Sequence, residues 1–399
     1  MRISNVETFH CDGGWRPFSF LKMSTDEGIV GWAEFTESAR NRGLGVVIRH
    51  LSERILGDDP RAFGRLTAAL SAATQLSSGG INQQAIAAIE NACLDITARA
   101  LGVPVYALFG GPMREHVPLY WSHCGNFRVR HADFFNRVLK TPPLESLDDI
   151  KRLGKEAIAR GFGAIKTSPI VFEDGRARTI NPGFNPVGLD FGLNLNHRTL
   201  VAIADQLAAF RDGLGSDAGL LMDVNFSFRP EGLRQIARAA EPSRLTWLEM
   251  DVRDPQALAG VRESTATPIA SLETLLGRRA YRPYFDAYAT DVAIVDVLWN
   301  GLWESVKIAS MAETYEVNIA PHNGNGPLAD LMSAHFCAAI PNLQMMEIEI
   351  DDVPWKDEFL DNPRVIQQGS LAIPSGPGWG SAIDEAAIAA RPWRASGTS

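Results

Sequence analysis

The stretch LLMDVN, residues 220–225, decides the fold of this chain, because an apolar run ends in an acidic residue and the pattern then recurs. The same pattern returns in LTWLEM (245–250) and in PIASLE (268–273). The spacing between these runs fits one buried strand followed by one helix. Repetition of that unit predicts parallel strands whose acidic ends meet at one edge.

Further runs of this kind lie on both sides of these three. The strand candidates also include VPLYWSHC (117–124), GAIKTS (163–168), VAIVDV (292–297), VNIAPHN (317–323) and LQMMEIEI (343–350). Most precede a stretch with helical spacing, such as LWESVKIASMAETY (302–315). The number of units and their period predict an α/β fold of the (β/α) barrel type. An open doubly wound sheet is the alternative, but no GxGxxG follows the first strand.

The chain before these units has a different pattern of predicted strands and helices. FSFLKMSTDEGIVGWAEF (18–35) predicts a hairpin, and helical spacing follows it until Gly102. Strands followed by helices predict an α+β domain. We expect this domain over residues 1–115, a barrel over 116–370, and a C-terminal segment, 371–399, that packs back onto the first domain.

The composition narrows the classes of function. A net charge of −9 without a local Lys/Arg cluster argues against nucleic acid as a partner. The N-terminus lacks the layout of a signal peptide and no window approaches 18 consecutive apolar residues, so we expect no membrane span and a cytoplasmic protein. The cysteines are isolated, which predicts free thiols, mostly in the core: Cys11, Cys93, Cys124 and Cys337.

Ionisable or polar residues end strand after strand in the predicted barrel: Lys166, Asp223, Asn225, Glu249, Glu273, Asp296, His322 and Glu347. Because the carboxyl ends of barrel strands form the catalytic face, these side chains should converge at the barrel mouth. Asp223, Glu249 and Glu273 would repel one another unless a cation joined them, and oxygen ligands suit Mg²⁺ or Mn²⁺. A solvated loop carboxylate is the simpler explanation for each alone, but not for three in register.

Asp296 and His322 end the next two strands. A carboxylate bonded to an imidazole fixes its tautomer and raises the basicity of the other ring nitrogen, so His322 is a candidate proton carrier. A lone histidine in a segment such as APHNGNG (320–326) is more often structural. The aspartate on the neighbouring strand favours catalysis.

This ordered set resembles the mandelate racemase subgroup of the enolase superfamily, as do FLKMSTDEGIVGWAEF (20–35) and AIENACLDITARALGVPVYALFGG (88–111). The resemblance covers essentially the whole chain and implies a modified (β/α)7β TIM-type barrel with an N-terminal capping domain. It also implies a homo-oligomer that abstracts the proton α to a carboxylate of a small-molecule substrate. The implied site residues are three carboxylate ligands for one Mg²⁺ per subunit (Asp223, Glu249 and Glu273), the His322/Asp296 dyad, Glu347 on the substrate carboxylate, and Asn225 lining the site.

The chain departs from the subgroup in GFGAIKTSPI (161–170). Racemases and several dehydratases of the subgroup have Lys-x-Lys at the end of the second barrel strand, whereas this chain has Lys166, Thr167 and Ser168. A serine hydroxyl is not ionised near neutrality, so Ser168 does not replace the second base unless another base activates it. Lys166 can stabilise the substrate carboxylate or an enediolate with its charge.

The loss of one base favours elimination over racemisation. A dehydratase needs His322 on one face only, and it would convert an acid sugar, an aldonate or aldarate, to a 2-keto-3-deoxy acid. We therefore predict a Mg²⁺-dependent carbon–oxygen lyase. A racemase or epimerase of a 2-hydroxy or amino acid, an isomerase with Lys166 as second base, is the alternative. A catalytically silent homologue that binds sugar acids is a third hypothesis.

Substrate specificity is expected from loops over the barrel mouth. Trp15 and Arg16 precede the hairpin, and Arg16 is a candidate for binding a distal hydroxyl or carboxylate, although such an arginine is as often an interdomain residue. Ser168 is a further substrate-binding candidate. The segment 169–198, rich in Gly, Pro and Asn, predicts a long loop that covers part of the site. Weaker candidates are Trp121, His123 and His197, the last as a second acid.

Overall fold

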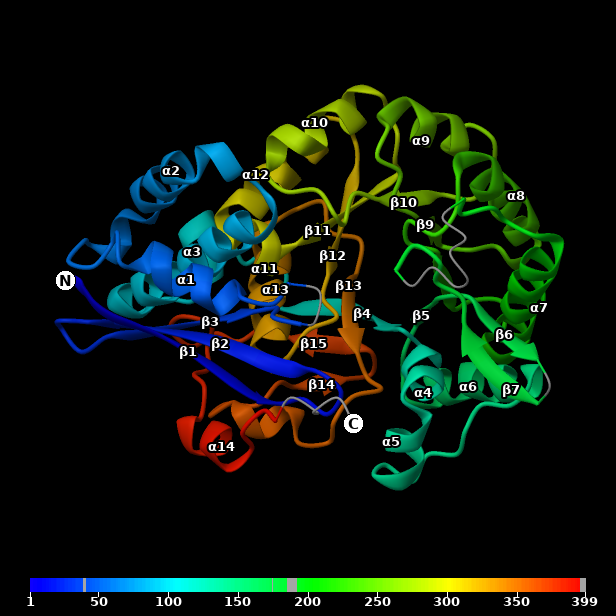
Figure 1. Ribbon diagram of the computed structural model, residues 1–399, viewed down its shortest axis with the longest axis horizontal. Coiled ribbons are helices and arrows are strands. Elements are labelled where there is room, and N and C mark those ends of the chain that lie inside the picture. The colour runs from blue at the N-terminus through cyan, green and yellow to red at the C-terminus, as the bar shows by residue number, and fades with distance from the viewer. Residues whose placement is uncertain (39–40, 174, 185–191, 395–399) are drawn as a thin grey trace.

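The computed structural model describes residues 1–38, 41–173, 175–184 and 192–394. Figure 1 shows a small N-terminal unit of strands and helices beside a larger ring of strands that helices surround. The N-terminal sheet is antiparallel and contains β1 (Ile3–Asp12), β2 (Pro17–Thr25) and β3 (Val30–Phe35). The predicted hairpin is therefore present, and Gly28 adopts the left-handed φ of 80° in the turn between β2 and β3.

The helices α1 (Leu44–Ser52), α2 (Phe63–Ala73) and α3 (Gly80–Leu101) complete the N-terminal unit. Helix α3 is buried along most of its length because it lies between β3 on one side and the barrel on the other. It ends where Gly102 takes a left-handed φ of 69° and its N–H donates to the carbonyl oxygens of the last turn. Its buried Asn91 bonds to the barrel through the carbonyl of Val297 and the N–H of Leu302.

The barrel strands run parallel and follow chain order around the ring. They are β4 (His116–Ser122), β5 (Ala164–Thr167), β8 (Gly219–Asp223), β9 (Trp247–Glu249), β10 (Ile269–Ser271), β11 (Val292–Asp296), β12 (Asn318–His322) and β13 (Met346–Glu349). β13 pairs with β4, and a parallel bridge between Ile319 and Leu343 closes the ring. Buried side chains such as Tyr120, Trp247 and Ile294 fill the interior. The predicted α/β barrel is confirmed.

Helices follow the strands on the outside of the ring (Figure 1). They are α4 (Asn126–Arg130), α5 (Ala132–Arg137), α6 (Leu147–Ala159), α7 (His197–Leu214), α8 (Pro230–Ala240), α9 (Pro255–Arg262), α10 (Arg278–Asp286), α11 (Val297–Asn300), α12 (Leu302–Glu313) and α13 (Pro327–Ala339). Short 3-10 turns lie at Pro60–Ala62, Gln75–Ser77, Val105–Phe109 and Glu241–Ser243. β13 is followed by another such turn, Lys356–Phe359, which gives the (β/α)7β pattern.

The segment 169–198 is more ordered than a long loop. β6 (Ile170–Glu173) and β7 (Arg176–Thr179) form an antiparallel hairpin, and α7 already begins at His197. The run of Ile, Val and Phe after Pro169 supplies strand-forming side chains, and Gly175 takes a left-handed φ of 71° in the turn. Residues 185–191 of this segment lie outside the described residues.

The C-terminal segment returns to both parts of the molecule. β14 (Ile366–Gln367) and β15 (Ser370–Ala372) form a hairpin whose second strand pairs antiparallel with β4. The last helix, α14 (Glu385–Ala390), lies beside β1, where the N–H of Asp12 donates to the carbonyl of Arg391 at 2.8 Å. The tail therefore contacts the N-terminal sheet directly.

Glu34 attaches the N-terminal unit to the helix that follows β12. Its buried carboxylate accepts hydrogen bonds from the N–H groups of Gly326, Leu328 and Ala329, which are free at the start of α13. A Cβ on Gly326 would lie 2.5 Å from the Glu34 carboxylate, so the close approach requires glycine. This contact holds the end of β3 near the carboxyl ends of the barrel strands.

Candidate active site

The ionisable residues that end the barrel strands converge at one face of the ring. Asp223 and Glu249 are register partners across β8 and β9, and Asp296 and His322 are register partners across β11 and β12. Parallel strands in register carry residues at equivalent positions to the same edge of the sheet. The repeat seen in the sequence thus becomes a cluster in space.

Asp223, Glu249 and Glu273 form a carboxylate trio, whose ligand oxygens all lie within 4.8 Å of one another. Burial raises the pKa of each to about 7, and the neighbouring carboxylates add to that effect. Oε1 of Glu249 is buried and has no hydrogen-bond partner among the described residues. The trio therefore fits a hard divalent cation such as Mg²⁺, which would bind oxygen donors and relieve their repulsion.

Asn225 holds one member of the trio in place. Its backbone N–H donates to Oδ1 of Asp223 at 2.7 Å, and its Nδ2 donates to Oδ2 at 2.6 Å. Asn225 has a left-handed φ of 49°, which is uncommon outside glycine and lets it turn back onto Asp223. Its own Oδ1 accepts from Asn181 of the segment 169–198.

Lys166 lies between two carboxylates. Its Nζ is 3.0 Å from Oε2 of Glu249 and 3.0 Å from Oε1 of Glu347, and all three side chains are buried. Burial alone would lower the pKa of Lys166, but Glu249 and Glu347 raise it well above its ordinary value. This arrangement favours the ammonium form of Lys166.

His322 and Asp296 form the predicted hydrogen-bonded pair. Nδ1 of His322 is 2.6 Å from Oδ2 of Asp296, whose Oδ1 accepts from the N–H groups at the start of α11. Nε2 of His322 is 3.6 Å from Oε1 of Glu273, so the free ring nitrogen faces the trio. Burial would lower the pKa of His322, but the carboxylates of Glu273, Asp296 and Glu347 raise it well above its ordinary value.

The negative charge of the Glu347 carboxylate is balanced by hydrogen-bond donors and a cation around it. It accepts from the Ser122 hydroxyl and from the N–H of Asn323, and it pairs with Lys166. Although burial opposes ionisation, Lys166, His322 and His123 hold the pKa of Glu347 well below its usual range. His123, Glu347 and Glu349 also lie within reach of a common ion, but Glu347 needs no metal to balance its charge.

A cavity of about 390 Å³ opens between these residues. The barrel lines it with Lys166, Asp223, Asn225, Glu273, His322 and Glu347, and also with His123, Arg130, Trp299, Gly324 and Asn325. The N-terminal unit contributes Thr36, Ser38, Asn41 and Gln84, and the segment 169–198 contributes Asn181 and Phe184. The predicted participation of segment 169–198 is visible in these two residues.

Sequence reasoning missed most of the residues that the loops supply to the cavity. Thr36, Asn41 and Gln84 come from loops and a helix start far apart in the chain, and no periodic pattern marks them. Asn325 had a signal, since it lies three residues after His322 in the same turn. Glu349 also had one, because it is an acid two residues after Glu347 on the same strand.

Three predicted substrate-binding residues are not among those that line this cavity: Ser168, Arg16 and Trp15. Ser168 is buried, and its backbone N–H and carbonyl oxygen both bond to the side chain of Asn126. Arg16 pairs with Asp352 at 2.9 Å, so it joins the first loop to the barrel as an interdomain residue. Trp15 stacks on His131 with ring centroids 4.7 Å apart.

Of the three weaker candidates for site residues, one lines the cavity and two do not. Trp121 is buried, does not line the cavity, and packs against the guanidinium groups of Arg128 and Arg160. His197 is exposed as the first residue of α7 and does not line the cavity, so the expectation of a second acid there is not supported by its position. His123 lines the cavity.

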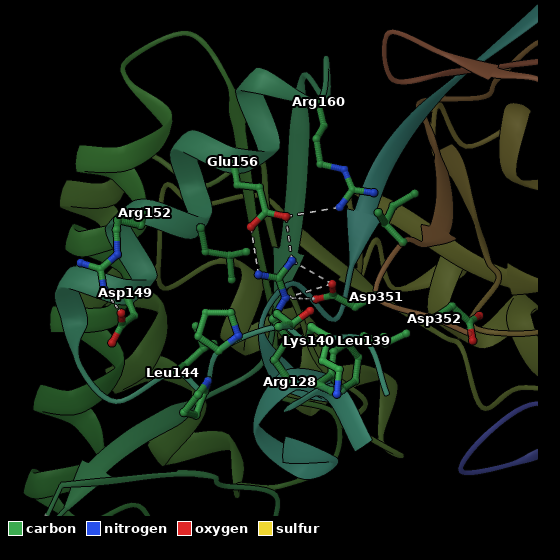
Figure 2. A pocket seen from close by; sticks show the side chains of 16 residues that line it. Arg128, Leu139, Lys140, Leu144, Asp149, Arg152, Glu156, Arg160, Asp351 and Asp352 are labelled. Carbon is green, nitrogen blue, oxygen red and sulfur yellow. Dashed lines mark hydrogen bonds and ion pairs between the residues drawn. The ribbon is translucent and has the colours of Figure 1, made fainter. Parts of the chain in front are cut away.

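A second cavity, of about 560 Å³, lies beside α6 (Figure 2). Figure 2 shows Arg128 bonded to both Glu156 and Asp351, while Arg160 also reaches Glu156. These charges neutralise one another within the protein, whereas the trio needs a cation. The smaller cavity at the barrel mouth is therefore the candidate active site.

None of the described helices is long and apolar enough to cross a membrane. The cysteines Cys11, Cys93, Cys124 and Cys337 are free and buried, as predicted.

Comparisons with known proteins agree with this geometry. Residues 149–387 match the family described as enolase C-terminal domain-like, and residues 12–110 match the N-terminal domain of mandelate racemase / muconate lactonizing enzyme. D-gluconate dehydratase of Thermoproteus tenax is 27% identical over 94% of this chain and 70% of the relative. D-galactonate dehydratase of Variovorax paradoxus (strain S110) is 29% identical over 97% of this chain and 94% of the relative.

A solved structure from Burkholderia xenovorans strain LB400 is 44% identical, with a TM-score of 0.94 over 98% of this chain and 96% of that chain. That protein carries the provisional name L-alanine-DL-glutamate epimerase and is bound to magnesium and fumarate. The relatives therefore have names from two classes of reaction, elimination and epimerisation.

Proposed function

The chain belongs to the mandelate racemase subgroup of the enolase superfamily, and from this premise we propose that it dehydrates an acid sugar to a 2-keto-3-deoxy acid. The substrate would be an aldonate or an aldarate, and one Mg²⁺ per subunit would be required. The observation that carries the proposal is the hydrogen-bonded pair of His322 and Asp296, which lies beside the carboxylate trio in the cavity.

Each residue has a distinct part in the proposed reaction. Asp296 orients His322 through Nδ1, and Nε2 of His322 removes the proton α to the substrate carboxylate. Lys166 stabilises the negative charge that develops on the substrate with its ammonium group. Asp223, Glu249 and Glu273 would hold Mg²⁺, which supplies electrophilic stabilisation of the enediolate when it is bound.

The surroundings of Lys166 favour elimination over epimerisation. Epimerisation needs a base on each face of the α-carbon, and the two ion pairs of Lys166 keep it protonated. Ser168, which stands where the subgroup often has its second base, is buried outside the residues that line the cavity. Dehydration needs one base and one acid, which this site can provide.

The names of the relatives support the same proposal. The curated relatives include dehydratases for D-gluconate, D-xylonate and D-galactonate, which are all aldonates. The second candidate function is epimerisation of an amino or 2-hydroxy acid, which the 44% identical Burkholderia structure favours through its provisional name.

A substrate screen tests the two candidates together. The purified chain with Mg²⁺ is incubated with a panel of aldonates and aldarates, and 2-keto acid formation is measured. Parallel reactions in deuterated water report exchange of the α-proton. Formation of a 2-keto acid supports dehydration, whereas deuterium in both epimers without 2-keto acid supports epimerisation. If no acid in the panel gives either a 2-keto acid or exchange of its α-proton, the proposal is contradicted.

We further propose that the enzyme is cytoplasmic and acts as a homo-oligomer. Four buried free thiols are typical of a reducing compartment, and the subgroup resemblance favours an oligomer. Light scattering on the purified chain would test the oligomer, and a monomeric mass would contradict it.

A further inference from the structure

We propose that His123, held by Glu349, is the general acid that protonates the departing β-hydroxyl group. This inference rests on the proposed dehydration and assigns the acid that the reaction requires. His123 ends the first barrel strand, β4, and its side chain is 23% exposed toward the cavity, while that of Glu349 is fully buried. The two residues form a second imidazole–carboxylate pair at the barrel mouth.

Gly324 shows how close the two histidines lie. A Cβ built on Gly324 would be 3.8 Å from Cε1 of His123 and 3.8 Å from Nε2 of His322. The same position would be 3.4 Å from Oε1 of Glu349. Both imidazoles therefore flank one point of the cavity, which glycine leaves open. A base and an acid at this separation can act on neighbouring carbon atoms of one substrate.

The partner of His123 fixes which nitrogen can reach the substrate. Nδ1 of His123 bonds to Oε1 of Glu349 and is 3.2 Å from the Ser122 hydroxyl oxygen. Nε2 makes no hydrogen bond among the described residues. Oε2 of Glu349 is buried and likewise has no partner among those residues. Because Nδ1 is held by Glu349, Nε2 is the ring nitrogen that is left to face the cavity and to carry a proton to a substrate.

The position of His123 is strongly constrained. Its φ of 44° is uncommon for a residue other than glycine, and such strain occurs at functional sites. Its ring stacks on Phe127 with centroids 4.7 Å apart and an angle of 9° between the planes. Arg128, which follows Phe127 in α4, is bonded to Glu156 and Asp351, so this short helix is anchored to its surroundings (Figure 2).

The other polar groups at the mouth are less suited to this role. Lys166 is bound on both sides by carboxylates, and Ser168 does not line the cavity. His322 is occupied by the α-proton during the step in which the hydroxyl departs. His123 is the remaining described imidazole that lines the cavity.

The proposed step balances in atoms and charge. His322 takes the α-proton, and the electron pair of that C–H bond is held in the enediolate. The enediolate then re-forms the carboxylate and a Cα–Cβ double bond, while the Cβ–O bond breaks and its electron pair leaves with oxygen. Nε2–H of His123 gives its proton to that oxygen, which departs as water. The enol tautomerises to the 2-keto-3-deoxy acid, and both histidines exchange protons with solvent to return to their initial states.

The test compares three forms of the acid that the screen identifies. The parent acid needs both proton transfers, its 3-deoxy-3-fluoro analogue loses fluoride without protonation, and its 3-deoxy analogue can only exchange its α-proton. His123→Asn should lower kcat for the parent acid by about 10²–10⁴-fold. It should leave fluoride release and α-proton exchange within about threefold of wild type. Glu349→Gln should show the same selectivity with a smaller loss, since it keeps an acceptor for Nδ1–H.

His197→Asn serves as the matched control, because His197 is exposed and is not among the residues that line the cavity. It should leave all three rates unchanged. The proposal is overturned if His123→Asn keeps the parent kcat, or if exchange and fluoride release fall as much as dehydration. It is also overturned if wild type binds two Mn²⁺ per chain and the variant binds one, since His123 would then be a metal ligand. Failure of wild type to dehydrate any acid would instead contradict the proposed function.

Discussion

The Nζ atom of Lys166 lies 3.0 Å from Oε2 of Glu249, so an ammonium group contacts one member of the carboxylate trio. The same nitrogen also contacts Glu347, and the side chains of Lys166, Glu249 and Glu347 are all buried. A lysine in this position supplies positive charge on one side of the cavity. In the proposed mechanism Lys166 therefore does not accept a proton, and the α-proton is removed from one face only.

One basic face predicts exchange with a single stereochemical outcome. In deuterated water, the 3-deoxy analogue of the substrate should incorporate deuterium at the α-carbon with retention of configuration, because only His322 delivers and removes the proton. NMR and chiral chromatography of the recovered acid provide the measurement. Deuterium in both epimers would show a second base and would favour epimerisation.

His322→Asn should abolish both α-proton exchange and dehydration, with a loss of about 10³-fold or more, because it removes the proton acceptor. Asp296→Asn should cause a smaller loss, since it keeps a hydrogen bond to Nδ1 but not the charge. Steady-state kinetics and the exchange assay provide the measurement, and circular dichroism checks that each variant folds. Turnover of His322→Asn near the wild-type rate would exclude His322 as the base.

Ser168→Ala should keep most of the activity, within about threefold of wild type. The side chain is buried, and the contacts of Ser168 with Asn126 are made by its backbone, which alanine retains. The measurement is kcat/KM for the acid found in the screen. A loss of two orders of magnitude would mean that the hydroxyl acts directly on the substrate.

Metal affinity should depend on pH in a defined direction. The three carboxylates of the trio have pKa values raised to about 7, so protons compete with Mg²⁺ below that pH. The apparent affinity should rise from pH 6 to pH 8 and then level off. Isothermal titration calorimetry at several pH values measures this, and chelation by EDTA should abolish turnover. Glu249→Gln should weaken binding, while the exposed Glu263→Gln should not. Equal affinity at pH 6 and pH 8 would contradict the prediction.

Glu90 should make the protein less stable as pH rises. Burial raises the pKa of Glu90 to about 8 in the folded protein, against an ordinary value of 4.5. Between these values the folded state holds a proton that the unfolded state has lost, so the free energy of unfolding falls with increasing pH. Above pH 8 no further decrease is expected from this group.

Glu90→Gln removes that dependence, because its amide keeps an acceptor for the N–H of Trp303 without an ionisable proton. Its Tm should match wild type near pH 4.5 and exceed it by at least about 2 °C at pH 8. Differential scanning calorimetry across this range provides the measurement, with the exposed Glu313→Gln as control. A constant difference at all pH values would show that the carboxyl group does not titrate in this window.

The barrel and the core of the site were predictable because they follow from local periodicity. Apolar runs that end in Asp223, Glu249 and Glu273 predict parallel strands, and parallel strands carry their ends to one edge. The closed ring and the meeting of these acids are confirmed by the structure. The predicted roles of these residues in metal binding and catalysis stay predictions.

The residues contributed by loops were not predictable in the same way. Thr36 and Gln84 reach the cavity because contacts such as those of Glu34 hold the N-terminal unit against the barrel, and no spacing rule encodes such contacts. The sequence makes Arg16 a candidate for substrate binding, but its ion pair with Asp352 spans 336 positions of the chain. Partners this distant in sequence cannot be inferred from a single chain.

The sequence by itself determined the order of strands and the convergence of their acidic ends, because alternation of strand and helix is a local property of the chain. Only the tertiary structure decided the state of each group. Two carboxylates hold Lys166 as a cation, Asp296 and Glu349 each orient a histidine, and Ser168 lies outside the cavity. These outcomes depend on burial and on distances between residues far apart in sequence, which exist only after the ring has closed.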